Sequence, residues 1–476
     1  MKFEQHTIRP IALSERHGRA RDLFTVWFGS NVMLLTVVTG ALAVTVFHLP
    51  LIWAIASLTL GNLGGAVFMA LHAAQGPTLG VPQMVQTRGQ FGSNGALLVI
   101  GVVVVMYVGF FASNLVLGAE ALHTIAPGLN GLVAIVVLGV LSVAGTIFGY
   151  DLIHTYTRLM TYASGAALIL TFVWIAVGGE LPPDILTRNS VTATGVLGAI
   201  SIAALWQIAY APYVSDYSRY LPPGTGVRPA FWATYWGSTL GSTAPMVLGV
   251  IVGLYARDSG IVAALGELTR GIAPIVFVIF SVAMIANNAM NVYCGALASL
   301  TVIQTWRPDW QPRAGARTMV SLVLLLVAMA LAILGKDSFL ETYTSFILLL
   351  FYVLIPWTAI NLVDYYIVRH GEYDVESFLR PDGGIYGRFN VPAVCCYILG
   401  TLVQLPFVST PLYRGPIARS LHDADLSWLV GLVVTSVAYY TLARRDAMWS
   451  ARKRASCQTP QIKGEALLDS HGNPRK

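Results

Sequence analysis

The feature that most constrains this chain is a series of long apolar stretches that contain no Asp, Glu, Lys or Arg. A helix needs about 20 mainly apolar residues to cross roughly 30 Å of hydrocarbon. The composition agrees with such helices, because 55% of the 476 residues are hydrophobic, only 11% are charged and the mean hydropathy is +0.66. Ordinary soluble domains carry roughly 25% charged residues. The sequence therefore predicts an all-α integral membrane protein with twelve transmembrane helices, at approximately residues 23–47, 51–71, 95–118, 131–149, 159–177, 191–214, 231–255, 271–303, 319–334, 342–363, 391–408 and 426–442.

Positive charge is distributed unequally over the segments that connect these stretches. With the N-terminus inside the cell, the cytoplasmic segments carry 23 of the 29 Lys and Arg residues, and the opposite segments carry six. This asymmetry follows the positive-inside rule, and a missed span in the middle of the chain would destroy it. We therefore expect a multi-pass protein of the plasma (inner) membrane with both termini in the cytoplasm. The cations are scattered over several loops, so a nucleic-acid partner is not expected.

Two of the predicted helices contain residues that weaken a helix near the bilayer centre. The first contains Trp27–Asn31 and later Thr39 and Gly40, and the sixth contains Trp206–Pro212. One interpretation is that these residues only kink or pack the helices, since Gly and Pro are common in membrane helices. The alternative is an inverted-repeat transporter, whose substrate site is built from unwound backbone at the midplane. The matched positions, five helices apart, favour the transporter.

Amide side chains in the eighth helix are candidate substrate ligands. Asn287 and Asn291 are four residues apart and share one helical face, and Asn288 lies about 100° around the helix from Asn287. An amide offers both donors and an acceptor, which suits the mixed edge of a heterocyclic base. Interhelical hydrogen bonding is the alternative role for a single Asn. Three asparagines within five residues favour a functional role.

Aromatic side chains supply the second component of base recognition, because planar rings stack on bases with roughly 1 to 3 kcal/mol per base. In the third helix Phe110 and Asn114 are four residues apart and lie on one face. In the sixth helix Trp206 stands next to the amide Gln207 at the interruption. Packing is the alternative role for these rings. It is the role that we expect for the neighbouring aromatic residues, Phe111 and Tyr210.

Charged groups are absent from the middle of the predicted helices, and the nearest acidic residues, such as Glu120 and Asp216, lie near helix ends. A charged substrate would then be buried without a counter-charge, so we expect a neutral solute. Neither the metalloprotease, hydrolase and nucleotide-binding motifs nor a paired-aspartate motif at a membrane face occurs in the sequence. The four cysteines form no CxxC pair and no cluster with histidine, so no metal site and no cofactor is predicted.

Several motifs resemble the purine-cytosine permease branch of the nucleobase/cation symporter family. They are Ser14–Gly18, Trp27–Asn31, Gly80–Gly92 and Asp216–Pro222. The likeness extends from about residue 12 to about residue 445. It implies a LeuT-like fold of two inverted five-helix repeats, at about 23–177 and 191–363, with two extra helices at about 391–442. Cytoplasmic tails at 1–22 and 443–476 would complete the chain.

The resemblance also implies how such a protein works and which residues bind the substrate. The family transports by alternating access, with the substrate between helices 1, 3, 6 and 8. The family's positions fall on Phe110 and Asn114 in the third helix, near Trp206 in the sixth, and on Asn287 and Asn291 in the eighth. A polar contact from the first helix would fall near Thr36.

One departure from the family pattern concerns the coupling ion. Sodium-coupled members have two adjacent hydroxyl residues just before the first amide of helix 8, whereas this chain has Ile285 and Ala286 there. The loss of two hydroxyl ligands favours the proton-coupled relatives over the sodium-coupled ones. The candidate proton carriers, Glu120, Asp216 and His72, all lie near helix ends.

We therefore expect a secondary active transporter that imports a neutral nucleobase or a related heterocycle by cation symport. The candidate substrates are cytosine, a purine, or a hydantoin- or allantoin-like ring. Two alternatives remain at this point. One is an integral-membrane enzyme that acts on a lipid-soluble substrate, and the other is a transporter of the same fold for a different small neutral solute.

Overall fold

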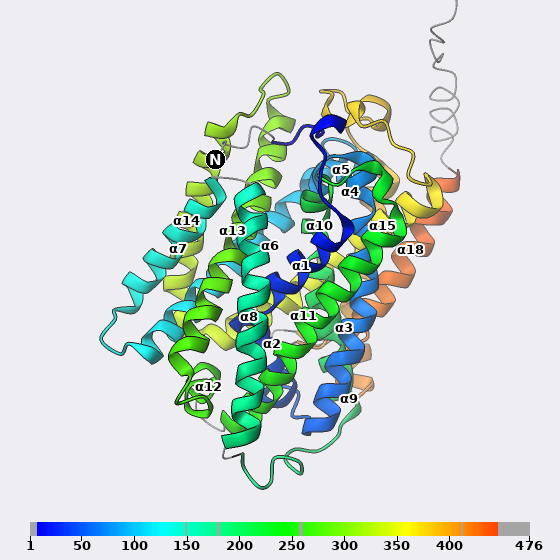
Figure 1. Cartoon of the computed structure of the whole chain (residues 1–476). Helices are drawn as coiled ribbons and strands as arrows, with labels where there is room; N and C mark the ends of the chain where they lie inside the picture. The colour runs from blue at the N-terminus through cyan, green and yellow to red at the C-terminus, as the bar shows by residue number, and fades with distance from the viewer. Residues whose placement is uncertain (1–6, 148–149, 179–180, 257–259, 411–412, 446–476) are drawn as a thin grey trace, which may run out of the picture.

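The computed structural model describes residues 7–147, 150–178, 181–256, 260–410 and 413–445 (Figure 1). Every named secondary-structure element among these residues is a helix or a helical turn. The predicted all-α class is therefore confirmed for these residues. Residues 1–6 and 446–476 of the two predicted tails and residues 148–149 of the fourth stretch lie outside the described part of the chain. The α-helices are α1 (Ala20–Asn31), α2 (Leu34–Thr45), α3 (Leu51–Ala73), α4 (Gln75–Leu79), α5 (Gln83–Phe91), α6 (Ala96–Ile125), α7 (Gly131–Ile147), α8 (Tyr150–Gly178), α9 (Ala193–Ala209), α10 (Ala211–Ser218), α11 (Val227–Ala256), α12 (Ile261–Leu268), α13 (Ala273–Trp306), α14 (Ala314–Gly335), α15 (Phe339–Leu362), α16 (Val391–Leu402), α17 (Pro416–Ser420) and α18 (Ser427–Arg445).

Shorter helical turns connect several of these elements. A π-helical segment, η4 (Val363–Val368), continues α15 directly. The 3-10 turns are η1 (Leu13–Glu15), η2 (Pro223–Thr225), η3 (Lys336–Ser338), η5 (Glu376–Leu379), η6 (Gly384–Tyr386) and η7 (Leu405–Phe407).

Each of the twelve predicted stretches coincides with a helix or with two consecutive helices. By length and composition, seven helical runs among the described residues suffice to cross a membrane, or eight if α1 and α2 together form one broken span. One of these runs, residues 314–368, contains both α14 and α15. The multi-pass character is thus shown, while the count of twelve spans stays a prediction.

The first predicted helix is broken where its sequence is weakest. α1 ends at Asn31, α2 begins at Leu34, and their axes differ by 63°. The side chain of Asn31 occupies the break and donates from Nδ2 to the backbone oxygen of Trp27 over 2.7 Å. The hydroxyl of Thr36 donates to the backbone oxygen of Asn31. The backbone oxygen of Asn31, at the break, is therefore bonded by a nearby side chain, as non-helical backbone inside a membrane protein requires.

The sixth predicted helix is also interrupted. α9 ends at Ala209 and α10 begins at Ala211, with Tyr210 between them. Pro212 stands at the start of α10, where its missing N–H and fixed φ are tolerated. Both predicted interruptions are thus confirmed.

Small residues allow the helices around these breaks to approach closely. The backbone of α2 at Gly40 lies against Met246 of α11, where an added Cβ would come within 2.2 Å of the Met246 backbone oxygen. Gly65 of α3 has the same relation to Ala204 of α9, at 2.5 Å from its oxygen. Membrane helices lack a hydrophobic drive to associate and pack mainly through such small residues.

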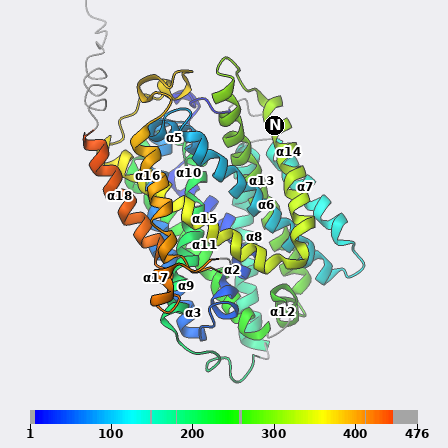
Figure 2. The ribbon, with the colours of Figure 1, turned by 180° about the vertical axis from the view of Figure 1, so that it is seen from behind.

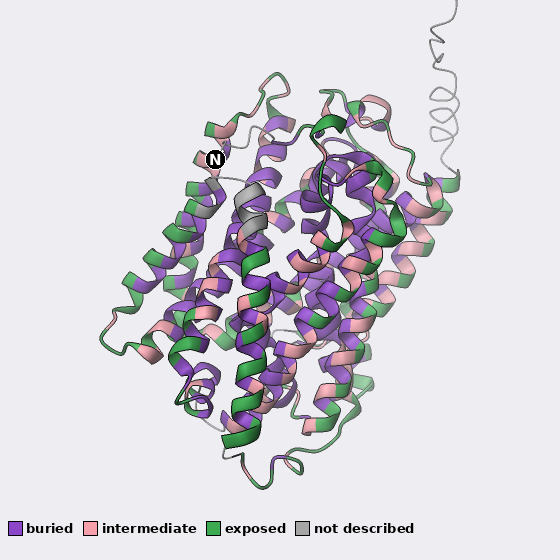
Figure 3. Ribbon diagram, in the orientation of Figure 1, coloured by how far each residue is buried: buried purple, intermediate pink, exposed green. Residues whose placement is uncertain are grey.

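The outer surface of the bundle is apolar where helices face outward. Along α8, green exposed positions follow the outer side of the helix in Figure 3. Ile169 of this helix is 66% exposed, and Val173 is 53% exposed. On α14, Leu326 and Leu334 are similarly exposed. Such an apolar surface is stable against lipid and costly in water. The interior, in contrast, contains many buried polar residues, among them Asn31, Asn114 and Asn287.

Four short helices had no counterpart among the predicted stretches, namely α4, α5, α12 and α17. All nine residues of α5 are buried at the upper end of Figure 1, although the helix contains Gln83, Arg88 and Gln90. Arg88 donates to the side chain of Gln304 over 2.8 Å and to the backbone oxygen of Thr301 over 2.7 Å, both in α13. These contacts bury a polar helix that its own composition does not identify.

Candidate substrate site

The two helix breaks face each other in the interior of the bundle. Trp206 of α9 donates from Nε1 to the side-chain oxygen of Asn31 over 2.7 Å. The same oxygen accepts a hydrogen bond from Ser242 of α11 at 2.9 Å. The ring of Tyr210 lies edge-on to Trp27, with 5.9 Å between ring centres. The breaks therefore form one structural unit rather than two independent kinks.

α13 brings a cluster of amides to this unit. Nδ2 of Asn287 donates to the backbone oxygen of Ser30 over 3.1 Å and to the hydroxyl of Tyr210 over 3.2 Å. Asn291 donates to Oδ1 of Asn287 over 3.2 Å and accepts from the hydroxyl of Tyr213 at 2.6 Å. The face shared by Asn287 and Asn291 thus points at the two breaks, as the four-residue spacing predicts.

Asn114 of α6 joins the amide cluster from the other side. Its Nδ2 donates to Oδ1 of Asn287 over 3.0 Å and to Oδ1 of Asn288 over 2.9 Å. Its own Oδ1 is buried and has no hydrogen-bond partner among the described residues. A buried acceptor without a donor is costly, and this one lies beside the side chains that carry the site.

Aromatic rings form the wall opposite the amides. Phe110 lies edge-on to Trp206, with 6.1 Å between ring centres, and edge-on to Phe346 of α15, at 5.4 Å. Tyr210 lies 5.9 Å from Trp206 and 5.4 Å from Tyr213. Rings and amides therefore face one another across a narrow gap.

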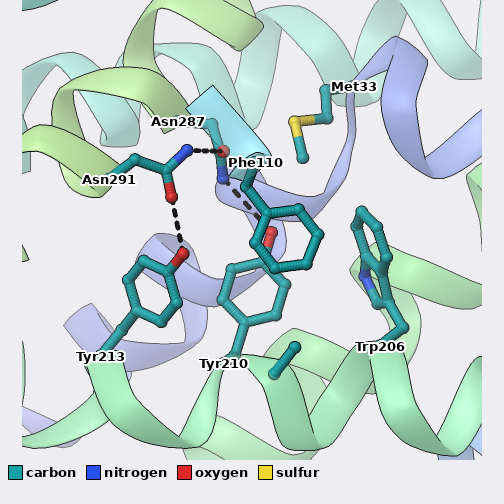
Figure 4. A pocket seen from close by; sticks show the side chains of 8 residues that line it. Met33, Phe110, Trp206, Tyr210, Tyr213, Asn287 and Asn291 are labelled. Carbon is teal, nitrogen blue, oxygen red and sulfur yellow. Dashed lines mark hydrogen bonds between the residues drawn. The ribbon is translucent and has the colours of Figure 1, made fainter. Parts of the chain in front are cut away.

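That gap is a small, nearly closed cavity (Figure 4). Its volume is about 10 Å³, which is space for roughly one water molecule. In Figure 4 the amides of α13 lie on one side and the rings of Phe110 and Trp206 on another. The residues that line it are Met33, Phe110, Trp206, Ala209, Tyr210, Tyr213, Asn287 and Asn291.

Four of the seven predicted site residues line this cavity, and the structure places the other three elsewhere. Phe110, Trp206, Asn287 and Asn291 line it directly. Asn114 lies behind Asn287 and contacts the cavity only through the amide cluster.

Gln207 and Thr36 serve the scaffold of the site. Gln207 donates to Asn62 of α3 over 2.8 Å and to Ser242 of α11 over 3.1 Å, and its oxygen accepts from Ser238. It therefore ties α9 to α3 and α11, away from the cavity. Thr36 is fully buried and bonds to the backbone at the α1 break.

Four cavity residues were not among the predicted site residues, namely Met33, Ala209, Tyr210 and Tyr213. Tyr210 was expected to pack, yet it lies four residues after Trp206, and Tyr213 follows three residues later. That i, i+4, i+7 spacing would have placed all three rings on one side of a helix. Phe111, also expected to pack, lies in an apolar cluster with residues of α7 and α14.

The lining contains no carboxylate, guanidinium or ammonium group, so its chemistry is that of neutral donors, acceptors and rings. Among the acidic and basic candidates, Asp216 is buried in α10 and accepts from the backbone N–H of Gln83 over 2.8 Å. His72 is buried in α3 and stacks on Trp357, with 5.1 Å between ring centres. Glu120 lines a separate open cleft near the far end of α6.

Comparison with known proteins places this arrangement in a family. Residues 10–431 match a family of permeases for cytosine/purines, uracil, thiamine and allantoin. A putative purine-cytosine permease of Bacillus subtilis, YxlA, is 39% identical over 455 residues, covering 93% of this chain and 96% of that protein. The purine-cytosine permease fcyB of Emericella nidulans is 24% identical over 463 residues, covering 93% of this chain and 88% of that protein.

The fold is similar to that of a solved transporter. Mhp1, a nucleobase-cation-symport-1 family transporter in a closed conformation with bromovinylhydantoin bound, superposes with a TM-score of 0.75 at 18% identity. The alignment covers 94% of this chain and 98% of Mhp1. The resemblance noted in the motifs is thus confirmed, and the enzyme alternative is excluded by the family. The chain belongs to the permease family for cytosine/purines, uracil, thiamine and allantoin.

Proposed function

We propose that this chain imports a neutral nucleobase or a related heterocycle by cation symport with alternating access. The observation that carries the proposal is the junction of two broken helices with the amides of Asn287 and Asn291 and the rings of Phe110 and Trp206. Amides read the donor and acceptor edge of a planar ring, and aromatic side chains stack on its faces. Mhp1 was solved with a hydantoin bound, and related permeases are named for purines and cytosine.

The architecture that we propose has twelve spans, arranged as two inverted repeats of five with two further helices. The run 314–368 supports this count because it has 55 residues. At 1.5 Å per residue a straight helix of that length would measure about 80 Å, which is more than twice the thickness of one hydrocarbon core. Two crossings would account for a run of this length. The broken helices α1–α2 and α9–α10 stand first in the two proposed repeats, at 23–177 and 191–363.

The proposed orientation places the upper end of Figure 1 in the cytoplasm, with the protein in the plasma membrane. The first described residues and the end of α18 lie at that end in Figures 1 and 2, together with α5 and the segment after η4. The segments with the excess of Lys and Arg therefore gather at one end of the bundle, which the positive-inside rule assigns to the cytoplasm.

For the coupling ion we propose a proton rather than sodium. The two positions before Asn287 are Ile285 and Ala286, which offer no side-chain oxygen. Ile285 packs against the apolar cluster of α6, α7 and α14. A sodium ion at this position would depend on backbone carbonyls and water for its oxygen ligands.

Uptake of a panel of radiolabelled heterocycles tests the function. The panel contains cytosine, uracil, adenine, hypoxanthine, hydantoin and allantoin, offered to cells that lack their own carriers. We expect saturable accumulation of at least one ring by the wild-type chain and weakened uptake by Asn287→Ala. Accumulation of none of them would contradict the proposed substrate class, and a neutral solute of another kind would then be sought.

A further inference from the structure

The polar groups of the closed cavity satisfy one another. The hydroxyl of Tyr213 donates to Oδ1 of Asn291 over 2.6 Å, and that oxygen has no other donor among the described residues (Figure 4). Asn291 in turn donates to Oδ1 of Asn287 and Oδ1 of Asn288. Tyr210 accepts one N–H of Asn287, and the backbone oxygen of Ser30 accepts from the same amide. The amides that would read a substrate are thus already paired.

The cavity is also too small for the ring that we propose as substrate. At about 10 Å³ it has room for roughly one water molecule. A heterocycle can enter only if the side chains that fill the space move apart. Because Tyr213 is hydrogen-bonded to a substrate-facing amide, its hydroxyl is among the groups that an entering N–H would have to replace.

We propose that the Tyr213 hydroxyl takes the place of a substrate N–H at Asn291 in the empty, closed site, and so permits the transporter to return without substrate. The inference rests on the proposed function, because only a carrier that cycles has an empty return step. An amide oxygen buried without a donor is strongly disfavoured. In the loaded site the substrate supplies the donor, and in the empty closed site Tyr213 supplies it.

If Tyr213 replaces the substrate in this way, its loss should affect the rates of net uptake and of exchange differently. Net uptake requires the empty carrier to pass through its closed form in every cycle. Exchange of internal for external substrate does not, since the carrier is loaded in both directions. Removing the Tyr213 hydroxyl should therefore slow net uptake and leave the rate of exchange nearly unchanged.

The decisive variant is Tyr213→Phe, which keeps the ring and removes only the donor. Proteoliposomes containing the purified chain are assayed with a substrate identified from the panel, once for net uptake and once for exchange against the same substrate inside. We expect the maximal rate of net uptake to fall by about tenfold, while the rate of exchange stays within about twofold of wild type. The ratio of the two rates is independent of the amount of active protein, so incomplete folding cannot imitate the result.

Two further variants sharpen the test. Tyr107→Phe is the matched control, because the Tyr107 ring lies 4.5 Å from that of Tyr213 while its hydroxyl donates to the backbone oxygen of Pro212 instead of an amide. Its ratio of net uptake to exchange should equal that of wild type. Tyr210→Phe should lower the ratio less than Tyr213→Phe, since Asn287 keeps its bond to Ser30.

The outcomes separate this inference from the proposed function. If wild type transports the ring and Tyr213→Phe loses net uptake and exchange in equal proportion, or loses neither, the inference is wrong and the function stands. If wild type neither accumulates nor exchanges any ring of the panel, both fail. A lowered ratio in Tyr107→Phe of the same size would also overturn the inference, since the effect would then not depend on the amide.

Discussion

Trp206 of α9 donates its indole N–H to the side-chain oxygen of Asn31 at the end of α1, and this 2.7 Å bond joins the two broken helices of the site. The same ring lines the cavity next to Phe110. One side chain therefore combines a structural bond with a surface for stacking. These two roles can be separated by substitution.

Trp206→Phe keeps an aromatic ring and removes the donor. We expect a loss of stability of about 1 kcal/mol, as for a single buried hydrogen bond, because Asn31 keeps its bond from Ser242. The KM for the substrate should change little, whereas Trp206→Ala should raise it through lost stacking. Thermal unfolding of the purified protein and initial uptake rates measure the two effects. Trp232→Phe, on an exposed position of α11, is the control for a generic loss of indole.

Phe110 and Phe111 form a natural pair for a test of the site wall. Phe110 lines the cavity, and its neighbour Phe111 is buried in an apolar cluster on another face of α6. Phe110→Ala should weaken substrate binding by roughly 1 to 3 kcal/mol while the protein reaches the membrane in normal amount. Phe111→Ala should reduce stability and leave KM unchanged. Equal effects of the two variants on KM would show that Phe110 acts through packing alone.

The fold was predictable to the extent that it depends on long apolar runs and on residues that weaken helices. Runs without charge have few alternatives to a buried or membrane-spanning helix, and the break after Asn31 follows from residues that form helices poorly. α5 could not be found in this way. It is buried through contacts such as Arg88 with Gln304 and Thr301 of α13, which are more than 200 residues away in sequence.

The site was predictable where a helix is continuous and less so across a break. Asn287 and Asn291 lie in the uninterrupted α13, so their spacing fixed a common face. Thr36 and Gln207 lie beside interruptions, where the direction of a side chain depends on how the helix resumes. Gln207 is buried against α3 and α11 for this reason, while Tyr210 and Tyr213, beyond the α9 end, face the cavity.

Asn287→Ala tests whether the amide cluster reads the substrate or only holds helices together. Asn114 and Asn291 both also donate to Oδ1 of Asn288, so the cluster keeps an acceptor when Asn287 is removed. We therefore expect near-normal expression and a loss of substrate affinity of about 1 to 3 kcal/mol. Asn288, which does not line the cavity, provides the comparison, since Asn288→Ala should affect affinity less. Wild-type affinity in Asn287→Ala would mean that the amide serves packing.

The contact of α2 with α11 should be sensitive to a single methyl group. A Cβ at Gly40 would lie 2.2 Å from the backbone oxygen of Met246, and a backbone atom cannot move aside as the end of a flexible side chain can. Gly40→Ala should destabilise the protein by about 1 to 3 kcal/mol or more. Gly64, on an exposed face of α3 with no atom within 4 Å of an added Cβ, is the control. Gly64→Ala should be neutral or stabilise by up to about 1 kcal/mol, as measured by thermal unfolding in detergent.

Replacement of sodium tests the proposed coupling ion. Because Ile285 and Ala286 provide no side-chain oxygen before Asn287, uptake should persist when sodium is replaced by choline. It should fall when a protonophore collapses the proton gradient. The measurement is the initial uptake rate at fixed membrane potential, across a sodium titration at two pH values. A saturable dependence on sodium without a response to pH would contradict proton coupling.

Asp216 offers a residue-level version of the same test. Its carboxylate is buried in α10, one turn after Tyr213, and accepts from the backbone N–H of Gln83. Asp216→Asn keeps an oxygen that can accept this bond but cannot take up a proton. If Asp216 carries the coupled proton, the variant should retain exchange of substrate and lose uptake driven by a pH gradient. Glu120→Gln, in the open cleft at the other end of α6, is the matched control and should keep both activities. Gradient-driven uptake that survives in Asp216→Asn would exclude Asp216 as the carrier, and its loss in Glu120→Gln would point to that cleft instead.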